Sequence, residues 1–288
     1  MTENPVLAVI GGSGLYHFPS LKNTSQIEID TPFGKLSSPI TLGELSGKKV
    51  AFLARHGIGH SILPTEVNSR ANIYALKSIG VTRIVSVSAC GSLREDYKPG
   101  QIVIPDQLID FTSQRPRTFF GEGVVAHIES ADPFCKDLST FVIEALKPTG
   151  AEVHKGGTYI TIEGPRFSTK AESNLFREWG MSIIGMTACP EAFLAREAEI
   201  CYATMAHVTD YDVWHASESP VTVEMVIKVL NQNTDLAQKA IENLVALLPA
   251  TNDCDCQNIL KDAIMTQPNI IPTKTIKKLG ILVEKYLS

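Results

Sequence analysis

The feature that most constrains the fold is a repeated alternation between short apolar runs and segments with helical spacing. The apolar runs predict strands over residues 6–10, 49–54, 83–89, 101–105, 157–162, 182–185 and 200–209. Helical spacing predicts helices over 67–79, 133–146, 168–179, 190–198 and 222–248. Strands that alternate with helices predict an α/β fold, in which helices cover both faces of a sheet.

Composition narrows the class of protein. The 288 residues carry a formal net charge of −5, and 44% of them are apolar, which excludes a mainly disordered chain and disfavours nucleic acid as a partner. No apolar stretch is long enough to span a membrane, and the first residues lack the basic start of a secretory signal. We therefore expect a cytoplasmic protein that binds a small molecule. We expect one catalytic domain over residues 1–250 and a C-terminal extension over 251–288.

Six cysteines in a chain of this length do not form a disulfide scaffold. Cys254 and Cys256 enclose a single residue, whereas a zinc knuckle has two residues between its thiols and a second pair nearby. The sequence therefore predicts no metal site. A local or inter-helix disulfide and a pair of free thiols both stay open. The expected terminal helix lies in the basic, apolar segment 274–287.

The ends of the predicted strands supply the candidate site, because ligands of α/β sheets bind outside the carboxyl ends of the strands. These ends hold glycines, hydroxyls, an Arg-His pair and two carboxylates: 11–14, 55–56, 88–91, 186–187 and 209–212.

The glycine loop does not match the common nucleotide-binding motifs. A dinucleotide fingerprint would need a third glycine where His17 stands. The segment from Gly43 to Lys48 has three spacers where a P-loop needs four. A hydrolase nucleophile elbow would need glycine where Leu15 follows Ser13. A tight turn is the plainer interpretation, although glycine amides and a serine hydroxyl also suit an anion.

The Arg55-His56 pair makes an anion site plausible without a P-loop. Arginine offers a planar fork of donors that fits phosphate, although an arginine at a strand end can also be merely solvated. Ser13, Ser88 and Thr187 add hydroxyl donors at three other strand ends. Tight packing between strand and helix is the alternative for these small residues, and burial in the core is the alternative for Met186.

The segment Asp210-Tyr211-Asp212 follows the longest apolar strand. Its paired carboxylates could bind Mg²⁺ or cap a helix. A third interpretation is a buried acid with a raised pKa, which could donate a proton to a ring nitrogen. The sequence pattern alone does not choose among these three.

Nine short motifs, in this order, carry a family resemblance. They are IGGSGL at 10–15, TPFG at 31–34, ARHG at 54–57, VNSRAN at 67–72, SACGSLR at 88–94, IEGPRFS at 162–168, GMT at 185–187, PE at 190–191 and TDYD at 209–212. Together they resemble the S-methyl-5′-thioadenosine phosphorylases of the purine nucleoside phosphorylase superfamily, over about residues 6–245. The resemblance implies a single-domain α/β fold with a mixed sheet, partly closed into a barrel, assembled as trimers or pairs of trimers. The Cys-x-Cys is similar to that of thermophilic archaeal members, some of which use disulfides.

The resemblance also implies roles for individual residues. Asp210 is the implied catalytic acid. The implied phosphate ligands are Ser13, Arg55, His56, Ser88, Ala89 through its backbone, and Thr187. The implied nucleoside contacts are Met186 at the ribose, Asp210, Tyr211 and Asp212 at the purine, Val223 and Ile227 at the methylthio group, and His127 from a neighbouring subunit. Ser168 and Val223 are the residues associated with substrate choice.

The implied reaction is phosphorolysis of S-methyl-5′-thioadenosine to adenine and S-methyl-5-thio-α-D-ribose 1-phosphate, in purine and methionine salvage. Such a pentosyltransferase needs no metal or organic cofactor, because phosphate is its co-substrate. Asp210 favours adenine, since a 6-oxopurine would suit an asparagine better. The alternatives are a purine nucleoside phosphorylase of broader or 6-oxo specificity, a nucleoside hydrolase, and a nucleoside-binding protein without catalysis.

Overall fold

The structure is a computed structural model that describes residues 4–12, 15, 18–215 and 223–287, without the side chains of 225–233. Its strands are β1 (Leu7–Gly11), β2 (Lys22–Ile27), β3 (Ile40–Leu45), β4 (Lys48–Ala54), β5 (Arg83–Ser92), β6 (Ile102–Ile104), β7 (Gln107–Phe111), β8 (Val153–Lys155), β9 (Thr158–Ile162), β10 (Ile183–Gly185) and β11 (Cys201–Asp210). Its α-helices are α1 (Ser69–Ser78), α2 (Lys136–Leu146), α3 (Lys170–Glu178), α4 (Glu191–Glu197), α5 (Val223–Leu247) and α6 (Thr273–Leu279). Single turns of 3₁₀ helix lie at Pro64–Glu66, Lys147–Thr149, Asp255–Asn258, Pro268–Ile270 and Gly280–Leu282.

The strands form one mixed sheet that divides at β5. One path runs β2-β3-β4-β1-β5-β10-β9-β7, and a branch from β5 runs through β11 and β6 to β8. The four central strands β4, β1, β5 and β11 are parallel to one another, whereas β10 is antiparallel to β5. The carboxyl ends of these four strands therefore meet at one edge of the sheet. The predicted class, a mixed α/β sheet flanked by helices, is confirmed.

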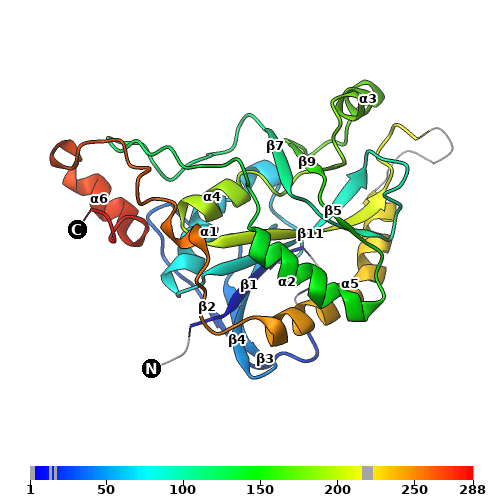
Figure 1. The fold of residues 1–288 in the computed structure, drawn as a ribbon, viewed down its shortest axis with the longest axis horizontal. Helices are drawn as coiled ribbons and strands as arrows, with labels where there is room; N and C mark the ends of the chain where they lie inside the picture. The colour runs from blue at the N-terminus through cyan, green and yellow to red at the C-terminus, as the bar shows by residue number, and fades with distance from the viewer. Residues whose placement is uncertain (1–3, 13–14, 16–17, 216–222, 288) are drawn as a thin grey trace.

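Two hydrophobic clusters lie on opposite faces of the sheet, because successive side chains of a strand point to opposite sides. In β11, Tyr202 joins the cluster that holds α1 and α4, while Ala203 and Met205 join the cluster that holds α2 and α5. Figure 1 shows α1 and α4 on one side of β11, and α2 and α5 on the other. All ten residues of β11 are buried, so the strand forms the centre of the core.

The predicted helices are present with shorter ends. The segment predicted over 168–179 is α3, whose N-cap Thr169 exchanges hydrogen bonds with Glu172 in a capping box. Sequence reasoning missed β2, because this strand exposes most of its residues and shows no apolar run. It also missed β7, which is five residues long and has no fully buried residue. It also missed β3 and β8, of which β8 is only three residues long.

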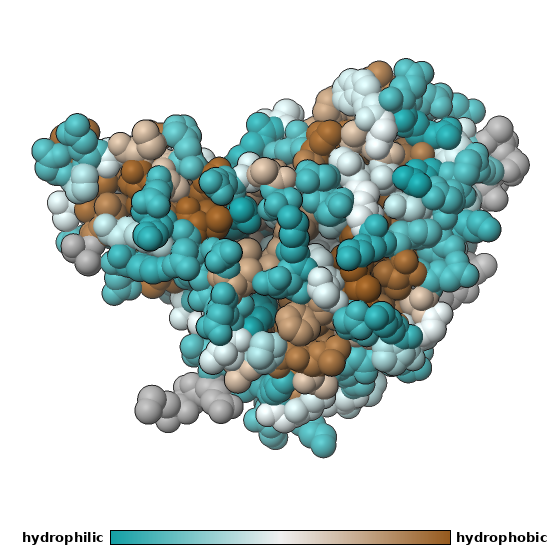
Figure 2. All heavy atoms as spheres, in the orientation of Figure 1, coloured by the Kyte–Doolittle hydropathy of each residue, from teal (hydrophilic) through white to brown (hydrophobic). Residues whose placement is uncertain are grey.

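From Leu260 onward, the segment after α5 packs against the side of the sheet that holds α1 and α4. Leu260, Ile271 and Leu279 are buried in the same cluster as those helices. The expected terminal helix over 274–287 is the shorter α6, followed by a 3₁₀ turn. On the face drawn in Figure 2, hydrophilic residues cover most of the surface, and one of the hydrophobic patches lies over the lobe that holds α6 (Figures 1 and 2). Among the described residues, no helix combines the length and the apolar character needed to cross a lipid bilayer.

Candidate active site

A pocket opens at the edge of the sheet where the carboxyl ends of the central strands meet. Side chains from the ends of β1, β4, β5, β10 and β11 line it, together with the loop before α1, the loop before α3 and the middle of α5. The described lining residues are Gly12, Leu15, Arg55, His56, His60, Pro64, Val87, Ser88, Ala89, Cys90, Gly91, Ile162, Phe167, Ser168, Ile184, Gly185, Met186, Thr187, His207, Thr209, Asp210, Asp212, Thr234 and Ala237.

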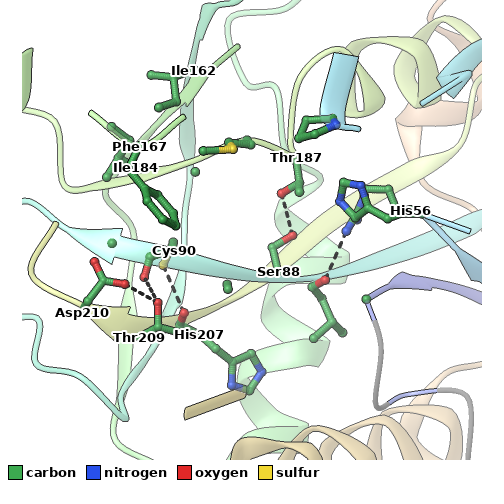
Figure 3. A pocket seen from close by; sticks show the side chains of 18 of the residues that line it. His56, Ser88, Cys90, Ile162, Phe167, Ile184, Thr187, His207, Thr209 and Asp210 are labelled. Atoms are coloured by element: carbon green, nitrogen blue, oxygen red, sulfur yellow. Dashed lines mark hydrogen bonds between the residues drawn. The ribbon is translucent and has the colours of Figure 1, made fainter. Parts of the chain in front are cut away.

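Polar groups gather in two places in this pocket. Figure 3 shows Ser88, Thr187 and His56 on one side, and Asp210 with Thr209 on the other. The apolar side chains of Ile162, Phe167 and Ile184 lie toward the Asp210 side (Figure 3). An elongated ligand with a polar group at one end and a flat apolar ring at the other would match this arrangement.

On the first side of the pocket, a chain of hydroxyl groups connects β9, the segment that follows β10, and β5. Tyr159 Oη lies 3.1 Å from Thr187 Oγ1, and Thr187 donates to Ser88 Oγ at 2.9 Å. Ser88 Oγ lies 3.2 Å from Ser86 Oγ, which accepts a hydrogen bond from Arg55 at 2.7 Å. These contacts fix the hydroxyls of Ser88 and Thr187 at the wall of the pocket.

Arg55 is fully buried beneath this chain. Its Nε and Nη2 donate to the two oxygens of Glu191, both at 2.9 Å, in a bidentate ion pair. Tyr202 donates to the same carboxylate at 2.7 Å. Burial alone would lower the pKa of the Arg55 guanidinium, but Glu191 raises it above its ordinary value. The pocket wall therefore holds a permanent cation that is already neutralised from behind.

His56 follows Arg55 and is neutral at pH 7. Its Nδ1 donates to the carbonyl oxygen of Ile62 at 3.0 Å, and its ring stacks on His60 at 4.5 Å between ring centroids. Burial first, and then the charge of Arg55, lower the pKa of His56 to about 4. Since Nδ1 carries the hydrogen, Nε2 is an acceptor.

Asp210 is the last residue of β11 and is almost completely buried. Its Oδ2 accepts from the hydroxyl of Thr209 at 2.6 Å, and its Oδ1 accepts from the amide of Asp212 at 2.7 Å. Burial raises the pKa of the Asp210 carboxyl to about 6, although both hydrogen bonds oppose the change. The carboxyl is therefore poised to hold or release a proton near neutral pH.

Asp212 and Gly91 complete this side of the pocket. Burial raises the pKa of Asp212, while the hydroxyls of Ser173 and Ser168 oppose the change. Gly91 lies beside both carboxylates, and a Cβ at that position would come within 3.0 Å of Asp210 Oδ1 and 3.2 Å of Asp212 Cβ. The absence of a side chain at Gly91 is therefore what admits the two carboxylates to this place.

Two sets of buried contacts fix the position of the segment that follows β10. Gly185 lets the Tyr159 hydroxyl pass close to its backbone and reach Thr187, because a side chain there would overlap the phenol. Arg115 donates from Nη1 to the carbonyl oxygens of Met186 at 2.8 Å and Cys189 at 2.7 Å. Its Nε pairs with Glu163 at 3.0 Å. The positions of Met186 and Thr187 are therefore fixed from behind the pocket.

His207 also lines the pocket, from β11. It is 1% exposed, and neither ring nitrogen has a hydrogen-bond partner among the described residues. Burial lowers the pKa of His207 to about 4, so the imidazole is neutral. An uncharged ring without partners in a buried position costs stability, which makes His207 an informative site for substitution.

The structure brings together most of the residues that the sequence singled out. The pocket is lined by Arg55, His56, Ser88, Ala89, Ser168, Met186, Thr187, Asp210 and Asp212. Tyr211 donates instead to the carbonyl oxygen of Glu95 at 3.4 Å, and Val223 and His127 are exposed away from the lining. Ser13 and the side chain of Ile227 lie outside the described residues.

Sequence reasoning gave no role to Ser86, Arg115, Tyr159 or Glu191. Glu191 carried the clearest signal, since a charged residue begins a helix that is otherwise rich in buried alanine and leucine. Ser86 lies two residues before Ser88 in the same strand and therefore points to the same face of the sheet. Nothing local marks Arg115 or Tyr159.

The pocket at the strand ends combines hydroxyls, a buried arginine and carboxylates. Comparison of the sequence with known families agrees with such a site. The sequence profile of the Phosphorylase superfamily matches residues 6–246. The chain belongs to this superfamily.

Within this superfamily, the chain is similar over nearly its full length to several curated proteins. The chain is 52% identical over 283 residues to the S-methyl-5′-thioadenosine phosphorylase of Geobacter sulfurreducens, covering 98% of this chain and 99% of the relative. It is 54% identical over 263 residues to the protein of the same name from Hyperthermus butylicus, covering 90% and 95% of the two chains.

Solved structures agree with this similarity. A methylthioadenosine phosphorylase from an antarctic soil metagenomic library has a TM-score of 0.92 and 48% identity, covering 97% of this chain and 99% of that one. A mutant of the adenosine/methylthioadenosine phosphorylase from Schistosoma mansoni, in complex with methylthioadenosine, has a TM-score of 0.79 and 36% identity, covering 86% and 93%.

Proposed function

We propose that this protein is a pentosyltransferase that splits S-methyl-5′-thioadenosine with phosphate. The products are adenine and S-methyl-5-thio-α-D-ribose 1-phosphate, which places the enzyme in purine and methionine salvage. The observation that carries the proposal is a buried carboxyl with a pKa of about 6 in the same pocket as a fixed set of hydroxyl donors. The full-length similarity to relatives with this activity supports the same reaction.

Asp210 acts as the general acid. Adenine is a poor leaving group as an anion, and a proton delivered to N7 makes its departure from C1′ easier. A pKa of about 6 keeps part of the carboxyl protonated at neutral pH, and a bound purine excludes more water from it. General acid catalysis typically accelerates a reaction about 10²–10⁴-fold, so Asp210 supplies a substantial part of the barrier reduction.

The opposite side of the pocket binds phosphate. The hydroxyl of Ser88 accepts from Thr187 and can therefore donate to a phosphate oxygen, and the Arg55–Glu191 ion pair holds the hydroxyl chain in place from behind. Because His56 is neutral with an acceptor at Nε2, it suits the P–OH of monohydrogen phosphate. The bound dianion attacks C1′ and also stabilises the cationic character that this carbon gains in the transition state.

The pocket favours adenine and an apolar 5′ group. A protonated Asp210 can donate to N7 while its other oxygen accepts from a 6-amino group, whereas a 6-oxopurine offers only an acceptor there. The ring of Phe167 and the side chains of Ile162 and Ile184 suit the face of a purine. Ala237 of α5 adds apolar surface for the methylthio group, in the helix where Val223 and Ile227 were expected to contribute.

Base release from four nucleosides tests this function. Methylthioadenosine, adenosine, inosine and methylthioinosine are each incubated with and without phosphate, and the free base is quantified. We expect phosphate-dependent release of adenine, fastest from methylthioadenosine. Faster release from the inosine compounds would contradict the role of Asp210, and release without phosphate would identify a hydrolase. Binding without release would identify a nucleoside-binding protein.

The reaction as proposed needs phosphate as co-substrate and no further cofactor. Protonation by Asp210 and stabilisation by the bound dianion account for both ends of the bond that breaks. Addition of EDTA to the assay is expected to leave the initial rate unchanged, and a loss of rate that Mg²⁺ restores would contradict this.

We further propose that the enzyme assembles as a homotrimer or a pair of trimers. Val125 and Met265 expose half or more of their surfaces and are joined by a backbone hydrogen bond of 2.9 Å, close to the exposed His127. An apolar patch of this kind favours contact with a second copy, and would let His127 reach a neighbouring pocket. Sedimentation velocity is expected to give the mass of three or six chains, with dissociation in Val125→Asp.

A cytoplasmic location completes the proposal. All six cysteines have free thiols, and unpaired buried cysteines are typical of reducing compartments. Cell fractionation is expected to recover the enzyme and its activity with the cytoplasmic proteins. Recovery in a secreted fraction would contradict it.

A further inference from the structure

Four cysteine side chains meet far from the pocket, at the opposite end of the central strands. The sulfur atoms of Cys135, Cys201, Cys254 and Cys256 all lie within 4.8 Å of one another. None of these residues lines the pocket, and none is joined in a disulfide. The fold therefore supplies the second pair of thiols that the sequence spacing did not reveal.

The four thiols come from three parts of the chain. Cys135 is the N-cap of α2, and Cys201 is the first residue of β11. Cys254 and Cys256 lie at the 3₁₀ turn that follows α5. The cluster therefore joins a helix, the central strand and the start of the C-terminal segment at one point.

The spacing of the sulfur atoms matches a tetrahedral metal site. Zinc–thiolate bonds of about 2.3 Å place tetrahedral sulfur atoms about 3.8 Å apart, whereas a disulfide needs about 2.05 Å. Cys135 Sγ and Cys254 Sγ are 3.6 Å apart, which is close to the tetrahedral value. We propose that these four cysteines bind one Zn²⁺ as a closed, structural site.

The surroundings stabilise the negative charge that such a site carries. Four thiols release four protons to solvent on binding Zn²⁺, which leaves a net charge of −2 on the complex. The Leu138 amide at the N-terminus of α2 donates to Cys135 Sγ at 3.4 Å, and Asn252 Nδ2 donates to Cys201 Sγ at 3.4 Å. The buried Arg83, which is the register partner of Cys201 in β5, adds a positive charge beside three of the cysteines.

The cluster can be reached from the surface of the protein. Cys254 is only half buried, which gives the metal a path of entry. Four protein ligands leave no open position for substrate, so the site would hold residues 251–258 against the sheet and take no part in the reaction.

Metal analysis of the purified full-length protein tests the proposal. The protein is produced in zinc-supplemented medium, purified anaerobically with a reductant, and analysed by inductively coupled plasma mass spectrometry. We expect one zinc per chain in the wild type and in the control Cys189→Ser, which removes a buried thiol outside the cluster. Cys254→Ser removes a ligand, so its affinity for zinc is expected to fall by more than the about 10-fold that loss of an outer-shell partner causes, and its zinc content is expected to fall clearly below one per chain.

A cobalt titration tests the metal site in the wild type alone, so its result does not depend on whether the cysteine variants fold. Co²⁺ added to the reduced, zinc-free wild type is expected to give the sulfur-to-metal charge-transfer band and the visible ligand-field bands of a tetrahedral tetrathiolate site. Absence of zinc from the purified protein together with absence of these bands would overturn the proposal. Iron or copper in place of zinc would overturn the assignment of the metal.

Discussion

The two ends of β11 hold two different kinds of buried polar cluster. Its carboxyl end carries Thr209 and Asp210 into the pocket, whereas its first residue, Cys201, belongs to the four-cysteine cluster. The pocket end combines carboxyls, hydroxyls and a paired arginine, and its carboxyl protons can be exchanged with a ligand. The cysteine end offers four soft ligands of one kind and no open position.

The difference shows what burial does to each set of groups. At the pocket end, burial raises the pKa of Asp210 and lowers that of His56, which prepares both for proton transfer or hydrogen bonding with a substrate. At the cysteine end, the proposed metal would take the place of the thiol protons and remove the need for any partner. One strand thus links a site suited to chemistry with a site suited to stability.

The largest expected effect would come from Asp210→Asn. Removing the general acid is expected to lower the rate of adenine release about 10²–10⁴-fold, because the amide cannot protonate N7. The rate with inosine relative to adenosine is expected to rise, since the amide can donate to a 6-oxo group. Steady-state kinetics measures both, and Asp132→Asn, an exposed residue paired with Lys136, is the control. Unchanged turnover in Asp210→Asn would contradict the assignment of Asp210 as the general acid.

Glu191→Gln would test how much the buried Arg55–Glu191 ion pair contributes to the stability of the protein. It leaves Arg55 buried with a weaker partner, and breaking a buried ion pair typically costs about 3–5 kcal/mol. Thermal and denaturant unfolding measure the loss. Glu144→Gln breaks an exposed pair with Lys147 and is expected to cost less than about 1 kcal/mol. Equal effects of the two variants would contradict the importance of burial for the Arg55–Glu191 pair.

A zinc chelator would test whether the cysteine cluster contributes to stability independently of the pocket at the other end of β11. Removing a metal that saturates its site about 100-fold above its Kd is expected to lower the free energy of unfolding by about 2.7 kcal/mol. We expect a strong zinc chelator to lower the Tm of wild type and of Asp210→Asn equally, and to leave the Tm of Cys254→Ser unchanged. Differential scanning fluorimetry measures all three. A chelator response that depended on Asp210 would mean that the metal lies in the pocket.

The smallest expected effect comes from His207→Met, between the two ends. Methionine removes two buried ring nitrogens without partners among the described residues and is expected to stabilise the protein by about 1–3 kcal/mol. The folded pKa of about 4 lies below the unfolded value of about 6.5, so the unfolded chain binds more protons in this range. The stability of the wild type is therefore lost as pH falls from about 6.5 toward 4. The Tm advantage of methionine should be larger at pH 5 than at pH 8, and equal advantages would contradict the neutral state of His207.

The sequence predicted the pocket better than the rest of the molecule. Arg55, His56, Ser88 and Asp210 could be found because each follows or ends an apolar strand, and the carboxyl ends of parallel strands meet at one edge. The strand β2 could not be found, because its exposed polar residues show no apolar pattern.

Long-range pairings were equally hidden. The partner of Arg55 lies 136 residues away, and only the packing of α4 against β11 brings Glu191 beneath it. Spacing within residues 254–256 disfavoured a metal, because the two other cysteines are more than 50 residues distant in sequence and close only in the fold. A local sequence pattern indicates which edge of a sheet holds the ligand site. It does not indicate which distant side chain pairs with a buried charge or completes a set of metal ligands.

The pairing of Arg55 with Glu191 has a consequence for how the anion arrives. Among the described lining residues Arg55 is the one lysine or arginine, and its charge is cancelled within 3 Å, in a chain whose net charge is −5. Long-range attraction therefore gives phosphate little help in reaching the pocket. Selection of the anion would rest on the directions of fixed hydroxyl dipoles, and capture of phosphate should be nearly insensitive to ionic strength.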